Sequence, residues 1–153
     1  MKIGVLALQG SITEHINMLR KCSVEAIAVK SPNDLGYVNG LIIPGGESTT
    51  IGRLMNLYGL DKEIIKRREQ GMPIYGTCAG AILLAKEIID DNIFKLNLMD
   101  ISVKRNDYGR QIDSFEADLS IKNFEKSFRG IFIRAPVIKS FYNGVEILSE
   151  FNN

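Results

Sequence analysis

Residues 72–85 read MPIYGTCAGAILLA. A short apolar run leads into a cysteine that lies between two glycines, Gly76 and Gly80, and a second apolar run follows. This order is typical of a nucleophile elbow, a sharp turn from strand to helix that exposes the side chain at its tip. Sulfur stands here at the position usually held by serine, and the helix dipole favours its thiolate form. The stretch predicts an α/β fold with Cys78 at the carboxyl end of a strand.

The chain before the elbow alternates between strand and helix patterns. Four apolar runs predict buried strands, and Ser11, with Glu14 three residues on, predicts a capped first helix. This order predicts a doubly wound, mostly parallel sheet flanked by helices, with ligands at the carboxyl ends of its strands. The expected strands are residues 2–8, 25–29, 40–43 and 72–75, and the later helices are residues 49–57 and 61–69.

The chain after Ile89 changes in pattern. Short stretches of alternating polarity, separated by turn residues, predict an added β-rich layer in place of further strand–helix units. The expected strands are residues 100–104, 114–119, 130–134 and 145–148.

Composition bounds the class of protein. A chain of 153 residues and 17.1 kDa is expected to form one domain. The net charge of +1 shows no basic footprint for nucleic acid or an anionic membrane. The sequence has no signal peptide, no apolar run near the roughly 20 residues of a membrane span, and no cysteine–histidine cluster with metal-ligand spacing. We therefore expect a cytoplasmic protein without a metal, nucleic-acid or membrane partner.

Two cysteines and one histidine are the residues to weigh for nucleophilic chemistry. A free cysteine is often a core residue, but the elbow pattern favours Cys78 as a nucleophile. Cys22 has no such surroundings and is interpreted as structural. A cysteine nucleophile needs a base, usually histidine. His15, beside Glu14 on the first predicted helix, is interpreted as a surface or edge residue and not as that base.

The loop after the third predicted strand is a second candidate region. Gly45-Gly46-Glu47-Ser48 can be a simple helix start, or its two glycines can aim backbone N–H groups at a developing oxyanion. Arg105 and Arg134 each end a predicted strand. An arginine in such a place is usually solvated, but its planar guanidinium also suits a carboxylate ligand.

Five stretches of the chain, in order and spacing, resemble the glutaminase subunits of pyridoxal 5'-phosphate synthases, a family of class I, triad-type glutamine amidotransferases. The resemblance runs from Lys2 to about Glu150 and implies a three-layer, flavodoxin-like α/β fold. The stretches are VLALQG (5–10), LIIPGGESTT (41–50), GTCAG (76–80), RNDYGRQ (105–111) and FIRAP (132–136).

The resemblance implies roles for individual residues. Cys78 would attack the side-chain amide of L-glutamine, and the N–H groups of Gly46 and Ala79 would form the oxyanion hole. Gln9 would lie near the contact with the synthase (lyase) subunit, which uses the released ammonia for vitamin B6 biosynthesis. Pyridoxal phosphate is then the product of the pathway, and no cofactor is expected here. The implied glutamine site is lined by Gly46, Glu47, Ser48, Arg105, Ile133 and Arg134.

The chain also departs from the family. Family members carry a His-Pro-Glu segment that supplies the base and the carboxylate orienting it, and residues 1–153 hold no counterpart. We therefore expect a single, C-terminally incomplete amidotransferase domain that is inactive or nearly so by itself. Val137 replaces a usual histidine, and Asp107-Tyr108 replaces Ser-Phe. Two alternatives stay open: a non-catalytic partner of the synthase, and a redox or chaperone protein of the same fold.

Overall fold

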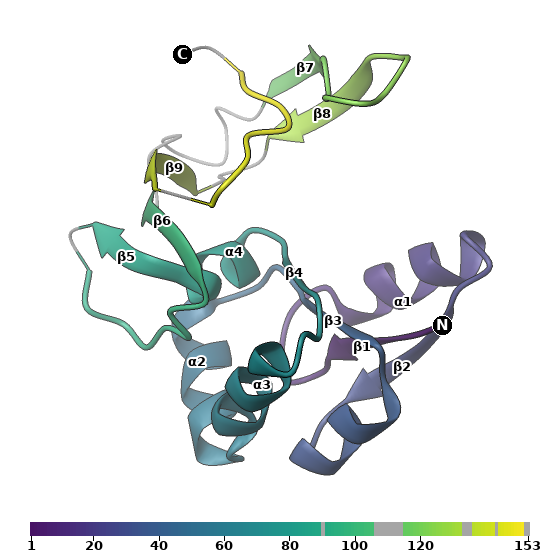
Figure 1. Ribbon diagram of the computed structural model, residues 1–153, viewed down its shortest axis with the longest axis vertical. Helices are drawn as coiled ribbons and strands as arrows, with labels where there is room; N and C mark the ends of the chain where they lie inside the picture. The colour runs from purple at the N-terminus through teal and green to yellow at the C-terminus, as the bar shows by residue number, and fades with distance from the viewer. Residues whose placement is uncertain (90, 106–114, 133–135, 143, 152–153) are drawn as a thin grey trace.

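The fold is built on a parallel four-stranded sheet (Figure 1). A computed structural model describes residues 1–89, 91–105, 115–132, 136–142 and 144–151. The strand order is β2-β1-β3-β4, and all three pairings are parallel. The expected parallel sheet is thus confirmed. Its strands are β1 (Lys2–Leu6), β2 (Glu25–Val29), β3 (Gly40–Ile43) and β4 (Ile74–Gly76).

Helices connect these strands and cover the sheet. Right-handed crossovers in this strand order place the first helix on one face and the later helices on the other. All the expected helices are present with ends shifted by about a turn or less, and a 3-10 helix not predicted from the sequence joins β2 to β3. The elements are α1 (Ile12–Lys21), η1 (Pro32–Tyr37), α2 (Ser48–Leu57), α3 (Leu60–Glu69) and α4 (Ala79–Leu84).

One hydrophobic core lies between the sheet and the helices η1, α2, α3 and α4. Strand side chains such as Leu6 and Ile43 are fully buried against Ile51 and Leu83. Complete burial of side chains of this size contributes about 1.5–3 kcal/mol each. By contrast, α1 has no fully buried residue, so its face of the sheet is less tightly covered. This core fixes the strand ends at which the candidate residues lie.

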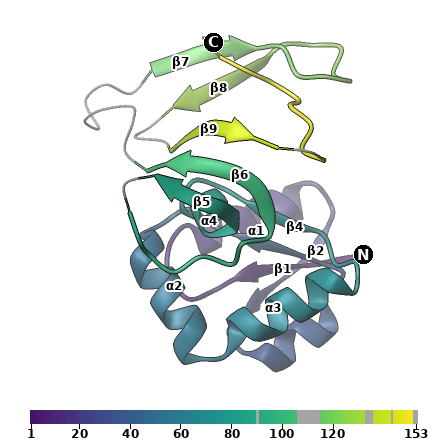
Figure 2. The same cartoon turned by 60° about the vertical axis from the view of Figure 1, so that its left-hand side comes forward.

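The second half forms two smaller sheets, as expected for a β-rich layer. Figure 2 shows the mixed sheet β5-β6-β9 between the helical body and the hairpin β7-β8. The strand β5 begins directly after α4 and was not predicted from the sequence. The strands are β5 (Ala85–Ile89), β6 (Met99–Lys104), β7 (Phe115–Leu119), β8 (Phe128–Phe132) and β9 (Val137–Phe141).

Two expectations for this half need correction. The strand expected at residues 145–148 is wrong, because this segment has no ladder partner among the described residues. Its backbone bonds are isolated ones: the Leu148 carbonyl accepts from the Lys122 N–H, and the Val145 N–H donates to the Tyr142 carbonyl. The strand found in this part of the chain is β9, which pairs with β6 on the side away from β5 and is joined to it also by the hydroxyls of Ser102 and Ser140. The strand expected at 130–134 begins two residues earlier, and residues 133–135 lie outside the described residues.

No helix among the described residues has both the length and the apolar character required to cross a membrane.

Candidate functional site

Cys78 lies in a strained turn between β4 and α4. Its backbone φ of 49° and ψ of −106° place a non-glycine residue in a region that L-residues rarely adopt. Such strain persists where the surrounding structure enforces it, most often at functional sites. The turn is closed by the Gly80 N–H, which donates to the Thr77 carbonyl at 2.8 Å. The Cys78 side chain is exposed, as an elbow nucleophile requires.

The elbow packs so closely on β3 that Gly80 tolerates no side chain. A Cβ added at Gly80 would lie 2.0 Å from the Ile43 carbonyl oxygen. A Cβ added at Gly76 would lie 2.5 Å from the Gly80 carbonyl carbon. The two glycines that mark the elbow in the sequence are therefore required by the approach of one backbone to another.

The loop after β3 lies directly beside the elbow. The Thr77 N–H donates to the Ile43 carbonyl at 3.1 Å, and the Gly45 N–H donates to the Thr77 hydroxyl at 3.0 Å. A Cβ added at Gly45 would lie 3.3 Å from the Cβ of Cys78. The structure thus brings together the two motifs that the sequence placed at neighbouring strand ends.

Ser11 and Gln9 hold this loop from the other side. The Ser11 N–H and hydroxyl both donate to the Gly45 carbonyl, at 3.0 and 3.3 Å. The expected capping box at Ser11 is therefore wrong, because its side chain bonds to Gly45 and not to its own helix. Gln9 Oε1 accepts from the Glu47 N–H at 2.8 Å. Gln9, expected near a partner subunit, thus lies half-buried against the loop.

Two backbone donors near the elbow are unused. Within the described residues, neither the Gly46 N–H nor the Ala79 N–H has a hydrogen-bond acceptor. Ala79 is the first residue of α4, where free N–H groups and the helix dipole favour negative charge. These are the two N–H groups expected to form an oxyanion hole.

Glu47 caps α2 and attracts an arginine from the β-rich half. Its carboxylate accepts from the N–H groups of Thr49 and Thr50 and from the Thr50 hydroxyl. These bonds, led by the Thr50 hydroxyl, lower the pKa of Glu47 to about 2. Arg105, which follows β6, lies 3.4 Å from Glu47 and also pairs with Asp91. The arginine is therefore not a free solvated strand end.

The last three residues expected in the glutamine site are Ser48, Ile133 and Arg134. Ser48 is buried at the first position of α2. Ile133 and Arg134 lie outside the described residues.

His15, interpreted from the sequence as a surface or edge residue and not as the base, is a half-buried residue that contacts the elbow. Its Nε2 lies 3.0 Å from the Thr77 hydroxyl, and its side chain is half-buried. Burial lowers the pKa of His15 below its ordinary value, and the charge of Glu14 offsets part of this effect. Among the described residues, the Cys78 thiol has no hydrogen-bond partner, so His15 does not contact the nucleophile as a base would.

The sequence reasoning missed three residues of this region. Thr77 bonds to both His15 and the Gly45 N–H, Ser11 holds the Gly45 carbonyl, and Asp91 pairs with Arg105. Only Thr77 carried a usable signal, because it lies inside the elbow, where a short hydroxyl can reach the neighbouring strand end.

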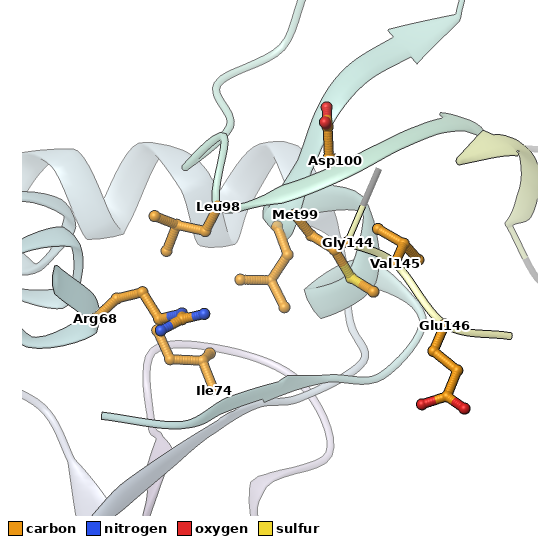
Figure 3. A pocket seen from close by; sticks show the side chains of 9 residues that line it. Arg68, Ile74, Leu98, Met99, Asp100, Gly144, Val145 and Glu146 are labelled. Atoms are coloured by element: carbon orange, nitrogen blue, oxygen red, sulfur yellow. The ribbon is translucent and has the colours of Figure 1, made fainter. Parts of the chain in front are cut away.

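A separate cavity of about 410 Å³ lies away from the elbow (Figure 3). It opens between β4, the start of β6 and the segment at residues 144–146, and none of the elbow residues lines it. Its charged groups, Arg68, Asp100 and Glu146, come from different elements. The described residues also contain no cluster of histidine, cysteine, aspartate or glutamate suited to a metal ion.

Comparison with known proteins assigns the family. The model of the SNO glutamine amidotransferase family matches residues 5–153. This chain belongs to the SNO glutamine amidotransferase family. Its match to this model and to the relatives below confirms the resemblance found in the sequence.

Individual relatives agree with this assignment. Pyridoxal 5'-phosphate synthase subunit PdxT of Oenococcus oeni is 54% identical over 152 residues, which cover 99% of this chain and 79% of the relative. The subunit of the same name from Pelotomaculum thermopropionicum is 51% identical, with 99% and 78% covered. A crystal structure of a glutamine amidotransferase superposes with a TM-score of 0.92 at 46% identity, covering 97% of this chain and 79% of the other.

More distant structures share the fold alone. A protein described as a putative GMP synthase subunit from Thermoplasma acidophilum superposes with a TM-score of 0.62 at 16% identity, with 97% of this chain and 72% of the other covered. The glutamine amidotransferase fold class expected from the sequence is confirmed by the crystal structure with 46% identity.

Proposed function

We propose that this chain is the glutaminase subunit of a pyridoxal 5'-phosphate synthase, which releases ammonia from L-glutamine with Cys78 as the nucleophile. The observation that carries the proposal is the strained, exposed Cys78 turn with two N–H groups on the flanking segments, those of Gly46 and Ala79, that have no acceptor among the described residues. The subunits named PdxT, at about half identity over nearly the whole chain, support the synthase context.

The reaction follows from this arrangement. The Cys78 thiolate attacks the side-chain amide carbon of glutamine, and the carbonyl electrons move onto oxygen. The N–H groups of Gly46 and Ala79 stabilise this oxyanion. The tetrahedral intermediate collapses, a proton is delivered to the nitrogen and ammonia leaves, so that a γ-glutamyl thioester remains on Cys78. Water then attacks the thioester, which releases glutamate and restores the thiol.

The remaining glutamine contacts belong to the same proposal. Glu47 and Ser48 begin α2 beside the oxyanion loop, and Arg105 extends toward Glu47 from the β-rich half. We assign these residues, with Ile133 and Arg134, to the glutamine pocket. A guanidinium suits the α-carboxylate of the substrate, because it offers planar paired donors.

The destination of the ammonia is the second part of the proposal. The ammonia passes to the synthase subunit, whose own lyase chemistry builds the cofactor, and Gln9 lies near the surface that this subunit contacts. We place this reaction in the cytoplasm.

The test is glutamine hydrolysis by a version of the chain extended through a His-Pro-Glu segment and mixed with the synthase subunit, because residues 1–153 by themselves are expected to be inactive or nearly so. Cys78→Ala should abolish release of ammonia and glutamate, because no other group can form the thioester. Cys22→Ala is the matched control and should stay within a few-fold of the parent chain, since Cys22 follows the end of α1, away from the elbow. Equal loss in both variants would remove Cys78 from its assigned role.

A binding measurement separates the rival role of a non-catalytic partner. The Cys78→Ala chain should still bind the synthase subunit with unchanged affinity. If the version extended through a His-Pro-Glu segment binds the subunit but makes no ammonia under any condition in which a close PdxT relative does, the non-catalytic role is the correct one.

A further inference from the structure

A polar network joins α1 to the loop beside the elbow. His15 Nε2 lies 3.0 Å from the hydroxyl oxygen of Thr77, and the same oxygen accepts from the Gly45 N–H at 3.0 Å. The three residues come from three segments that are far apart in the chain. Because Thr77 directly precedes Cys78, these contacts help to fix the positions of the backbone groups around the nucleophile.

The Thr77 hydroxyl can take either role in its bond to His15. Its oxygen accepts from the Gly45 N–H and keeps both its own proton and a second lone pair, so it can donate to His15 Nε2 or accept a proton from it, depending on the tautomer. Burial lowers the pKa of His15 more than Glu14 raises it, which favours the neutral imidazole, and a neutral imidazole can form either bond.

Hydrogen bonds hold the loop on both sides of the Gly46 N–H, which itself has no acceptor among the described residues. Ser11 binds the Gly45 carbonyl, and Gln9 binds the Glu47 N–H. Because a peptide unit is planar and trans, fixing the Gly45 carbonyl also fixes the direction of the Gly46 N–H. The Thr77–Gly45 bond fixes the preceding peptide unit. The orientation of the Gly46 N–H therefore depends on this whole set of bonds.

We propose that His15 is a positioning residue for the glutaminase reaction. By orienting the Thr77 hydroxyl it holds the Gly45 peptide, and through that peptide it sets the place of the Gly46 N–H at the oxyanion. This inference rests on the proposed function. It assigns His15 no proton transfer with substrate, which agrees with the absence of any contact to the thiol among the described residues.

The test compares two electrophiles that react with Cys78 in the chain itself. A chloroketone analogue of glutamine places its carbonyl oxygen where the substrate oxyanion forms, whereas iodoacetamide alkylates a thiolate without needing that site. His15→Ala and Thr77→Val should each slow the chloroketone reaction about 10- to 100-fold, because small displacements of reacting groups have effects of this size. The iodoacetamide rate should be unchanged.

Conservative variants and a neighbour serve as controls. His15→Gln and Thr77→Ser keep a hydrogen-bonding group at each position and should recover most of the chloroketone rate. Asn17→Ala changes an exposed residue on the same helix and should react like the parent chain. Adding His15→Ala to Thr77→Val should cause no further loss, because both changes break one network.

Two results would overturn this inference. One is a chloroketone rate in His15→Ala equal to that of the parent chain. The other is an equal fall in both electrophile rates, which would mean that His15 supports only the fold or the thiolate. If the parent chain itself shows no chloroketone reaction at Cys78, both the proposed function and this inference fail. A change seen only in the His15 variants tests this inference alone.

Discussion

Arg105 shows how one side chain can connect two parts of the chain at the site. It follows β6 in the β-rich half and pairs with Asp91 and with Glu47, the residue that begins α2. In the absence of substrate these carboxylates hold the guanidinium in place. A glutamine α-carboxylate would therefore meet an arginine that is already oriented.

Arg105→Ala should raise the KM for glutamine more than it changes stability. A hydrogen bond to a charged group contributes about 1.5–3 kcal/mol, which corresponds to roughly tenfold or more in binding. Arg129→Ala is a matched control, because Arg129 also bridges two carboxylates, Glu116 and Asp118, but lies on the hairpin β7-β8. Steady-state kinetics check this. An unchanged KM in Arg105→Ala would mean that Arg105 forms a structural ion pair only and does not bind the substrate.

The elements around the elbow depend on close backbone contact. The start of α4 is pressed against the end of β3, where the Gly80 position leaves no room for a Cβ. The same contact keeps the Cys78 turn at its unusual φ and ψ angles.

Gly80→Ala should destabilise the chain by at least about 1–3 kcal/mol, the usual effect of overpacking. The new methyl group would meet the Ile43 carbonyl, which cannot move without disturbing the sheet. Gly36→Ala is the control, because an added Cβ there meets nothing within 4 Å. Urea unfolding of the two variants checks this, and equal midpoints would contradict the close packing described at the elbow.

The cap of α2 predicts a pH dependence. The folded-state pKa of Glu47 is about 2, below its ordinary value of 4.5, because its carboxylate accepts bonds from Thr50 and Thr49. Its contribution to stability is therefore full above pH 4.5 and is lost as the pH falls from 4.5 toward 2. The free energy of unfolding of the parent chain should exceed that of Glu47→Gln at pH 7, and the difference should shrink over that range. A difference that is constant with pH would contradict this.

The whole molecule places the nucleophile in the parallel-sheet half and one of its proposed binding groups in the β-rich half. Figures 1 and 2 show the small sheets extending from the helical body in which the elbow lies. The loop with Gly46 and the elbow with Cys78 meet because β3 and β4 are neighbouring parallel strands. Residues far apart in the chain thus meet at one edge of the sheet.

Much of this organisation could be predicted from the sequence. The runs at β2 and β3 were placed to the residue, since buried parallel strands are continuous apolar segments bounded by turn residues. The elbow and the glycine loop were found because their chemistry requires a local pattern. Their proximity followed from the strand order.

The rest depended on contacts that no local pattern reports. Residues 137–141 do not alternate in polarity, yet they pair with β6, whereas residues 145–147 alternate and the segment has no ladder partner among the described residues. The contact of His15 with Thr77 was not predicted, because Thr77 lies 62 residues away in the chain. The partners of Arg105 were missed for the same reason.

Residues 1–153 should turn over glutamine slowly when they act without another base. Their one histidine is His15, which bonds to Thr77 and not to the thiol. Proton transfer by a positioned base typically contributes about 10²–10⁴-fold. An ammonia assay should show this deficit against a version extended through a His-Pro-Glu segment. Comparable rates would show that His15 or a group from the synthase subunit serves as the base.

The central claim is that Cys78 is the nucleophile of a glutamine site. The most direct measurement is peptide mass spectrometry of the chain after reaction with the chloroketone analogue of glutamine, with and without excess glutamine. We expect the adduct on the peptide that contains Cys78, a slower reaction when glutamine is present, and no adduct on Cys22. An unmodified Cys78, or labelling of both cysteines at a rate that glutamine does not change, would contradict the claim.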